Sequence, residues 1–403
     1  CIPWHIPLQF HFHLTGAPMK KIISLLISLL LIGSVSLSSQ DFPLDLKNSV
    51  WPAAWIACPG SEPQGYGVYL YRRTFDLEKA PGKFIVHVSA DNRYRLYVNG
   101  IEASEGPSRG DPDHWRYESV DLAPLLKSGR NVLAALVWNY GEYIPWAQMT
   151  RRTAFLLQGD GPLEKVANTG AGTWKVIQDM SFSALPGSWD AATGRMEGSR
   201  GFKVVGPGDR VDGSRCIWGW ADVDFDDSGW QTPIEVGRRA TPRAITDGGS
   251  FWNLVPRPIP AMEKRPEAPG RICRSSGISP DEGFLSGGKP LLVPASSRVS
   301  LLIDQGYLTN AYPELTVSGG KDALVRLIWS EALFDSTGEK QNRDRVEGMN
   351  IFGNYDEFVP DGGPQRRFST LWFRTFRYLQ IEIATANEPL TIHSLKNKIG
   401  RAH

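Results

Sequence analysis

Apolar and polar residues alternate with a period of two along much of this chain, most clearly from residue 84 to residue 100, FIVHVSADNRYRLYVNG. Apolar side chains stand at every second position over 84–90 and again over 94–98, a pattern that predicts two half-buried β-strands. Asn99 and Gly100 both tolerate positive φ, so they predict a tight hairpin turn after the second strand. Between the two strands, Asp91 and Asn92 place a carboxylate and an amide at a strand end.

Short strands separated by turn residues recur along the rest of the chain. We expect further strands at 68–77, 131–138, 153–157, 299–304, 324–329, 355–359 and 373–383. Sequence periodicity of 3.6 residues, which would indicate an amphipathic helix, is not sustained over more than a turn or two. The sequence therefore predicts an all-β protein with two consecutive β-sandwich domains of the jelly-roll, galactose-binding-like kind.

The beginning of the chain has a different pattern, which is typical of an export signal. Met19 and two lysines precede an apolar run at 22–31, and small residues at 34–39 offer cleavage sites. We interpret residues 1–18 as an upstream artefact and residues 19–39 as a signal peptide. The apolar run is short for a membrane span. We therefore expect a periplasmic or secreted protein with no membrane span after signal cleavage.

Breaks in the strand pattern suggest the domain boundaries. We expect the first β-sandwich at 48–262, a linker at 263–289 and the second β-sandwich at 290–396. The last strand is followed by neither a helix nor a capping segment in the sequence. We interpret residues 397–403 as the tail of a truncated sequence.

Composition narrows the class of function. The 403 residues include 44 Lys and Arg against 43 Asp and Glu, a balance that gives no sign of a nucleic-acid partner. The 14 tryptophans suit sugar stacking, although most tryptophans of a β-sandwich fill its core. Outside the upstream segment, Cys58, Cys216 and Cys273 are widely spaced and odd in number. They predict neither a zinc site nor a disulfide framework, and the sequence does not decide whether two of them pair.

The sequence contains no nucleophile elbow, phosphate-binding loop or zinc-protease motif, so we assign no catalytic residue. Glycoside hydrolysis needs a pair of carboxyl groups. Five acidic residues of the second half lie at the ends of predicted strands or close to them: Asp304, Glu331, Asp335, Asp356 and Glu357. Solvated loop carboxylates and turn-formers are the more frequent explanation for such residues, and spacing alone does not place two of them at catalytic separation.

Polar and aromatic residues gather in three segments of the first half where strands end. These are the pair Asp91-Asn92 and the loops 106–115 and 139–146. Aromatic faces stack on sugar rings, and amides and carboxylates bind sugar hydroxyls. We predict a sugar-binding site formed by Asp91, Asn92, His114, Trp115, Glu142, Tyr143 and Trp146.

The oxygen atoms of Asp91 and Asn92 also suit Ca²⁺, which prefers hard oxygen ligands. We expect no required cofactor, and calcium is the one candidate. The alternative is structural, with Asp91 capping a hairpin and the loop aromatics packing against each other.

Two stretches that include these segments carry a family resemblance. ADNRYRLYVNG (90–100) and GPSRGDPDHWRYESVDLAPLLKSGRNVLAALVWNYGE (106–142) resemble the N-terminal β-sandwich of bacterial α-L-rhamnosidases. DFDDSGW (224–230) and RPIP (257–260) look like the end of the same domain. The segments 307–335 and 371–383 resemble the β-sandwich that follows in those enzymes.

The resemblance implies a parent glycoside hydrolase that releases terminal α-L-rhamnosyl residues with inversion. Its acid and base lie in a later (α/α) barrel, so none of its catalytic residues can be carried over to this chain. Related modules of the family bind L-rhamnose through Ca²⁺, and Asp91 and Asn92 match those modules in residue type.

We therefore expect a non-catalytic N-terminal fragment of an exported α-L-rhamnosidase, without the C-terminal catalytic domain. It would be inactive as a hydrolase and would bind rhamnose-containing glycans in an accessory role. Two alternatives stay open. The first is a stand-alone carbohydrate-binding protein or adhesin. The second is the front part of another exo-glycosidase such as a β-galactosidase.

Overall fold

Strands and short 3₁₀ helices make up the regular structure of the chain, which we describe from a computed structural model. It describes residues 45–170, 172, 174–185, 188–190, 195–197, 205–237, 239–245 and 250–401. None of these residues is in an α-helix, which confirms the predicted all-β class. The predicted upstream segment 1–18 and the predicted signal peptide 19–39 lie outside the described residues.

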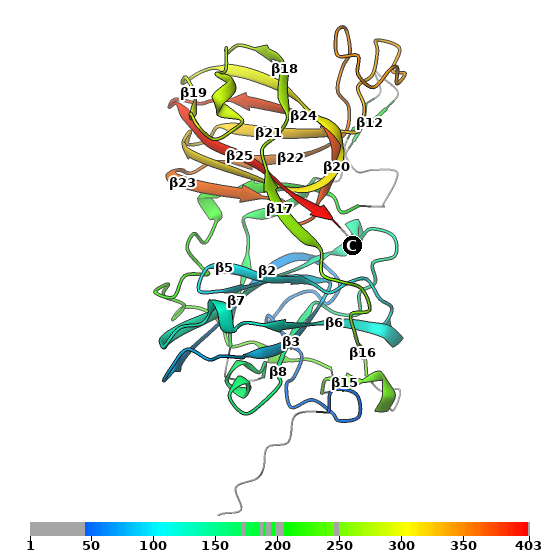
Figure 1. Cartoon of the computed structure of the whole chain (residues 1–403), viewed down its shortest axis with the longest axis vertical. Coiled ribbons are helices and arrows are strands. Elements are labelled where there is room, and N and C mark those ends of the chain that lie inside the picture. The colour runs from blue at the N-terminus through cyan, green and yellow to red at the C-terminus, as the bar shows by residue number, and fades with distance from the viewer. Residues whose placement is uncertain are drawn as a thin grey trace, which may run out of the picture. The chain divides into compact units, whose positions relative to one another are not determined.

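Two facing sheets form the first sandwich (Figure 1). The five-stranded sheet has the order β5 (Ile101–Gly106), β4 (Arg93–Val98), β7 (Gly129–Tyr140), β2 (Tyr66–Leu77) and β9 (Lys175–Asp179). The seven-stranded sheet has the order β14 (Ile234–Glu235), β1 (Ile56–Ala57), β8 (Ala154–Gly159), β3 (Ile85–Asp91), β6 (Trp115–Asp121), β16 (Asn253–Pro256) and β15 (Thr241–Pro242). Strands β2 and β7 pair over twelve residues, which makes them the longest ladder of this sandwich.

The core of the first sandwich is built by the alternation seen in the sequence. The apolar positions of 84–90 and of β4 belong to one buried cluster, together with alternate residues of β7. Asn99 and Gly100 adopt φ values of 51° and 82° at the turn between β4 and β5, which confirms the predicted hairpin. Because this period is two, the residues between the core positions of β4 point to the opposite face of the sheet.

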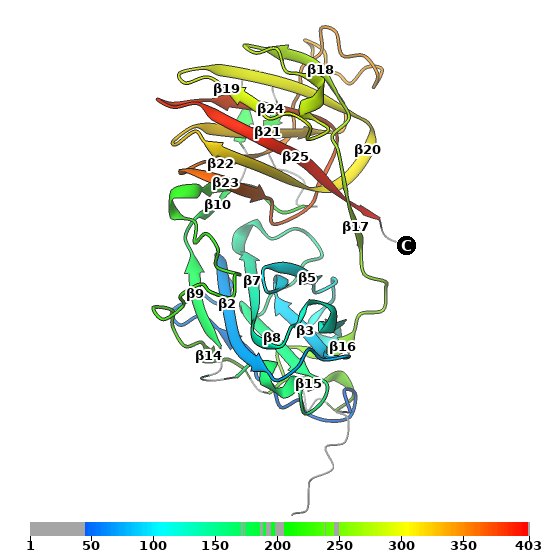
Figure 2. The same ribbon diagram turned by 60° about the vertical axis from the view of Figure 1, so that its left-hand side comes forward.

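One eleven-stranded sheet that curves back on itself forms the second sandwich (Figures 1 and 2). Its strands are β10 (Phe182–Leu185), β13 (Gly208–Asp212), β17 (Glu263–Glu267), β18 (Arg271–Ser276), β19 (Leu291–Val293), β20 (Arg298–Gly319), β21 (Leu324–Ser330), β22 (Asn354–Val359), β23 (Gly362–Ser369), β24 (Arg374–Ala384) and β25 (Leu390–Arg401). Strand β20 is 22 residues long and shifts register between Asp304 and Thr309. This irregularity lets one strand pair with β18 before it, with β23 and β25 after it, and with β24 on both sides of it.

The remaining elements are small. β11 (Ser188–Asp190) and β12 (Arg195–Glu197) form a separate two-stranded sheet. The 3₁₀ helices are η1 (Pro112–His114), η2 (Ala123–Leu125), η3 (Gly141–Tyr143), η4 (Glu164–Ala167), η5 (Gly213–Arg215), η6 (Arg243–Ile245) and η7 (Glu282–Phe284). Within the described part of the chain, Cys58, Cys216 and Cys273 are free thiols.

The strand pairing crosses the boundaries expected from the sequence. β10 and β13 lie within 48–262 but belong to the second sheet, where β13 runs parallel to β22. β17 and β18 lie within the predicted linker 263–289 and pair with β25 and β20. β25 continues to Arg401, so residues 397–401 of the predicted tail pair with β17. The sequences of β17 and β18, EKRPE and RICRSS, lack the apolar alternation that would have predicted a strand.

Leu327 lies in the core of the second sandwich and is 1% exposed, whereas Leu292 on β19 is 58% exposed. We expect Leu327→Ala to lower the free energy of unfolding by about 2–5 kcal/mol, because it leaves a cavity among packed side chains. Leu292→Ala is the matched control and should change the stability by less than about 0.5 kcal/mol. Chemical denaturation followed by tryptophan fluorescence measures both, and equal losses would contradict this core assignment.

Candidate functional site

Asp91 ends β3 and Asn92 lies between β3 and β4, and both side chains are fully buried. Asp91 Oδ2 accepts hydrogen bonds from the backbone N–H of Arg151 at 2.6 Å and of Arg152 at 3.0 Å. It also accepts one from Trp252 Nε1 at 2.9 Å. Burial raises the pKa of Asp91, and these hydrogen bonds oppose that shift. One oxygen of the carboxylate thus anchors the loop before β8 to the end of β3.

The remaining side-chain oxygen atoms of this pair are buried as well. Among the described residues, Asp91 Oδ1 and Asn92 Oδ1 have no hydrogen-bond partner, although both atoms are buried. Buried polar atoms are nearly always satisfied, so two neighbouring exceptions point to a bound group or an ordered water. The part of the chain that the structure describes holds no cluster of three His, Cys, Asp or Glu side chains that would bind a metal. A cation at this point would therefore depend on amide and carbonyl oxygens besides Asp91.

The aromatic residues of the predicted sugar site separate into buried and accessible ones. Trp115 is 3% exposed, packs edge-on against Trp252 and donates its Nε1–H to the carbonyl oxygen of Ala90 at 3.3 Å. Trp146 is 61% exposed. Tyr143 is partly buried, and its ring meets Tyr66 edge to face at 6.2 Å. Trp146 therefore offers the most open aromatic surface of the set.

The two remaining residues of the prediction are accessible and lie in 3₁₀ helices. His114 ends η1, its side chain is 41% exposed, and its Nδ1 lies 3.1 Å from Asp111 Oδ1. Glu142 is exposed in η3. The structure thus gives the predicted site a buried group, Asp91, Asn92 and Trp115, and an accessible group, His114, Glu142, Tyr143 and Trp146.

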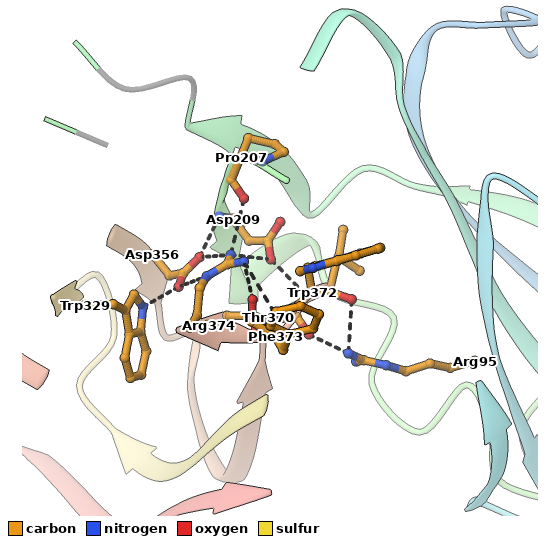
Figure 3. Close-up of polar contacts among 10 residues, drawn as sticks. Arg95, Pro207, Asp209, Trp329, Asp356, Thr370, Trp372, Phe373 and Arg374 are labelled. Atoms are coloured by element: carbon orange, nitrogen blue, oxygen red, sulfur yellow. Dashed lines mark hydrogen bonds and ion pairs between the residues drawn. The ribbon is translucent and has the colours of Figure 1, made fainter. Parts of the chain in front are cut away.

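A second cluster, which the sequence did not predict as a unit, consists of Asp209, Asp356 and Arg374 (Figure 3). We call it the buried ion cluster. Arg374 is 2% exposed and lies between the two fully buried carboxylates. It donates to Asp356 through Nε at 2.9 Å and Nη2 at 2.5 Å, and to Asp209 through Nη2 at 3.2 Å. The cluster joins β13, β22 and β24 of the second sandwich.

The loop before β24 connects this cluster to the first sandwich. Asp209 Oδ2 accepts the backbone N–H of Leu371 at 2.8 Å. Arg95 of β4 reaches the same loop and donates from Nη2 to the carbonyl oxygens of Thr370 at 2.6 Å and Leu371 at 3.2 Å (Figure 3). Arg95 occupies one of the β4 positions between core residues, so it projects from the outer face of its sheet. The loop 370–373 is therefore held from both sides.

Electrostatics single out Asp209 within the buried ion cluster. Burial raises the pKa of Asp209 to about 7, the nearby charge of Asp356 adds to the shift, and Arg374 opposes it. The Oδ1 atom of Asp209 is buried and has no hydrogen-bond partner among the residues described. Arg374 remains charged, because both carboxylates raise its pKa. Asp209 is thus the residue of this cluster that gains or loses a proton near neutral pH.

The acidic residues considered for catalysis are largely engaged in structural contacts. Asp304 pairs with Arg377 at 2.9 Å, and Glu357 pairs with Arg326 at 2.8 Å. Asp335 accepts hydrogen bonds within its own turn, which lowers its pKa. Asp356 belongs to the buried ion cluster, and Glu331 is exposed. Four of these five carboxylates thus hold cations or turns of the fold.

Because the pKa of Asp209 is raised, we expect it to make the stability depend on pH. Between about pH 4 and pH 7 the folded protein keeps a proton that the unfolded chain has released, so the free energy of unfolding falls as the pH rises. Asp209→Asn should remove this contribution, which amounts to a few kcal/mol because one pKa unit corresponds to about 1.4 kcal/mol.

Chemical denaturation at about pH 4.5 and about pH 7.5 tests this expectation in wild type, Asp209→Asn and the exposed control Asp76→Asn. The loss of stability between the two pH values should be smaller in Asp209→Asn than in the other two proteins. An identical loss in all three proteins would contradict the assignment.

A scan against protein-family models finds no match for this chain. In sequence it is 27% identical over 196 residues to an α-L-rhamnosidase of Streptomyces avermitilis, which covers 48% of this chain and 15% of that enzyme. The chain thus spans a small part of this curated relative. No helix among the described residues is long and apolar enough to cross a membrane.

Solved structures of rhamnosidases share its fold. The GH78 family rhamnosidase of Bacillus sp. GL1 matches 88% of this chain and 56% of its own with a TM-score of 0.69 and 14% identity. The α-L-rhamnosidase of Aspergillus terreus matches 87% of this chain and 36% of its own with a TM-score of 0.53 and 17% identity. The resemblance inferred from the sequence is confirmed: this chain is similar to α-L-rhamnosidases in sequence over about half of its length and in β-sandwich fold over most of it.

Proposed function

We propose that this chain is the non-catalytic, carbohydrate-binding part of an exported α-L-rhamnosidase that acts on rhamnose-containing glycans. The observation that carries the proposal is the fold agreement with the Bacillus rhamnosidase over 88% of the chain, joined to the sequence similarity with the Streptomyces enzyme. The segment 19–39, read as a signal peptide, supports export to the periplasm or the medium.

The sugar site of this proposal is centred on Asp91 and Asn92. The unpaired Oδ1 atoms of these two residues supply hard oxygen donors, and this donor set fits Ca²⁺. When bound, the ion would supply a fixed positive centre for sugar hydroxyl groups. The hydrogen bonds from Arg151, Arg152 and Trp252 hold the Asp91 carboxylate in one orientation, so its free oxygen is positioned in advance.

The accessible group would provide the remaining contacts to the sugar. Trp146 offers a ring face to the apolar side of a pyranose, and His114 and Glu142 offer polar atoms to hydroxyl groups. These residues lie on segments that leave strands of a rigid sandwich, where binding residues are often found. A monosaccharide provides few atoms and must give up bound water, so we expect weak binding.

We expect the full chain to bind L-rhamnose weakly in the presence of Ca²⁺, as measured by calorimetry. Asp91→Asn keeps the size of the side chain and removes its charge, so it should weaken binding about tenfold or more, as loss of a charged ligand does. A chelator should have the same effect. The matched control is Asp76→Asn, an exposed aspartate on β2, which should bind as wild type does.

Two outcomes would contradict the proposed sugar site. The first is a folded wild-type protein that binds no rhamnose with Ca²⁺ present. The second is rhamnose binding that neither the chelator nor Asp91→Asn changes. In the second case Asp91→Asn would affect stability alone, as expected of a purely structural carboxylate that holds the loop before β8.

We also expect the chain to show no hydrolysis of an aryl α-L-rhamnoside. The physical reason is that four of its five candidate carboxylates are held by arginines or by turn N–H groups. Purified chain should match a vector control, with a complete α-L-rhamnosidase as the positive control. Turnover that copurifies with the chain and disappears in Glu331→Gln would contradict this expectation.

A further inference from the structure

A cleft of about 580 Å³ lies between the outer face of the five-stranded sheet and the outer face of the second sandwich. Tyr97 and Leu136 line it from the first sandwich, and the segment 216–222 closes one side. Strands β20, β23 and β25 form its floor. Volumes of this size are typical of sites for small molecules. None of the residues assigned to the proposed rhamnose site lines this cleft.

Polar residues cover the floor of the cleft because they alternate with core residues. Leu315 and Val317 of β20 point into the core, so Glu314 and Thr316 point outward. The strand register aligns two outward rows, Arg367–Thr316–Ser394 and Ser369–Glu314–Lys396. Directly opposite side chains in such rows are close enough to contact one ligand together.

Two positively charged side chains of this floor, Arg367 and Lys396, are exposed. Glu314 Oε2 lies 2.9 Å from Lys398 Nζ but 3.9 Å from Arg367 Nη1, so Lys398 is its closer partner. The Arg367 side chain is 61% exposed. Lys396 is exposed and makes no ion pair within the described part of the chain. Arg367 on β23 and Lys396 on β25 thus flank β20, which carries Glu314 and Thr316 between them.

Aromatic rings form the opposite wall. Trp220 and Tyr97 meet edge to face at 5.5 Å, and both are partly exposed. Trp218 is fixed by an Nε1–H bond to the carbonyl oxygen of Gly213 at 3.0 Å, and the Arg366 guanidinium lies 4.5 Å from its ring. Acidic groups are also present, since Asp222 is exposed at the rim and the largely buried Asp179 has a raised pKa.

We propose that this cleft binds a uronic acid unit of an acidic oligosaccharide. The wall offers ring faces to a pyranose, and the floor offers hydroxyl groups to its hydroxyls. A carboxylate on the sugar would lie within reach of Arg367 and Lys396, and charge-assisted hydrogen bonds of this kind are among the strongest polar contacts. The cleft is a second site with its own ligand, and it does not depend on the proposed rhamnose site.

Calorimetry on the full chain tests the proposal with trigalacturonate and trimannuronate, two acidic trisaccharides of different stereochemistry. The methyl esters of the same trisaccharides are the chemical control, because they keep the rings and lose the negative charge. We expect binding of at least one acid form, no detectable binding of its ester, and weaker binding as the salt concentration rises.

The protein variants locate the site. Arg367→Gln combined with Lys396→Gln should weaken binding about tenfold or more, because each substitution removes a charged donor at an exposed position. The matched control combines Lys83→Gln with Lys289→Gln, two exposed lysines that do not line the cleft. The control should bind as wild type does.

Failure of both acid trisaccharides to bind would overturn the proposal. Equal binding of acids and esters, or an unchanged affinity in the Arg367→Gln, Lys396→Gln variant, would do the same. Rhamnose binding is measured on the same preparations. A loss at the cleft with rhamnose binding retained therefore separates the two sites, and either site can fail without the other.

Discussion

The buried guanidinium of Arg374 is the interaction on which the arrangement of the second sandwich depends. It is surrounded by Asp356, Asp209 and the carbonyl oxygens of Pro207 and Trp372, and no part of it can be solvated by bulk water. Removing one partner of such a cluster leaves an uncompensated buried charge, which is strongly destabilising. β13 therefore has to stay in the sheet beside β22, although the chain between β10 and β13 is long.

The same cluster controls how the loop 370–373 meets the first sandwich. Asp209 accepts the N–H of Leu371, while Arg95 donates to the carbonyl oxygens on the other side of that loop. Arg93 adds a cation–π contact, with its guanidinium 4.2 Å from the Trp372 ring. Arg95 also lines the cleft between the sandwiches. The geometry of the cleft thus follows from contacts that the buried ion cluster keeps in place.

Much of the fold could be predicted because residues close together in the sequence determine its strands and turns. The alternation over 84–98 and the residues Asn99 and Gly100 are sufficient for two strands and their hairpin. The pairing of β13 with β22 joins residues about 150 positions apart. Neither strand has a sequence pattern that identifies the strand with which it pairs. Short polar edge strands such as β17 were missed for the same reason. One feature of the sequence could have indicated the role of Arg95: it is a charged residue between the core positions of a strand, so its side chain points away from the core.

For the candidate sites, residue type alone did not predict which side chains are accessible to a ligand. Tryptophan content suggested sugar stacking, yet Trp51, Trp55, Trp138, Trp174, Trp252 and Trp329 are all fully buried. Position outside a strand does not by itself expose a tryptophan, because four of these six, Trp51, Trp55, Trp174 and Trp252, lie outside the strands. Trp146 and the pair Trp218 and Trp220 lie outside the strands and keep exposed surface. In the proposed sites, recognition of sugars would therefore rest on loop aromatics and on polar atoms that the sheets hold in fixed positions.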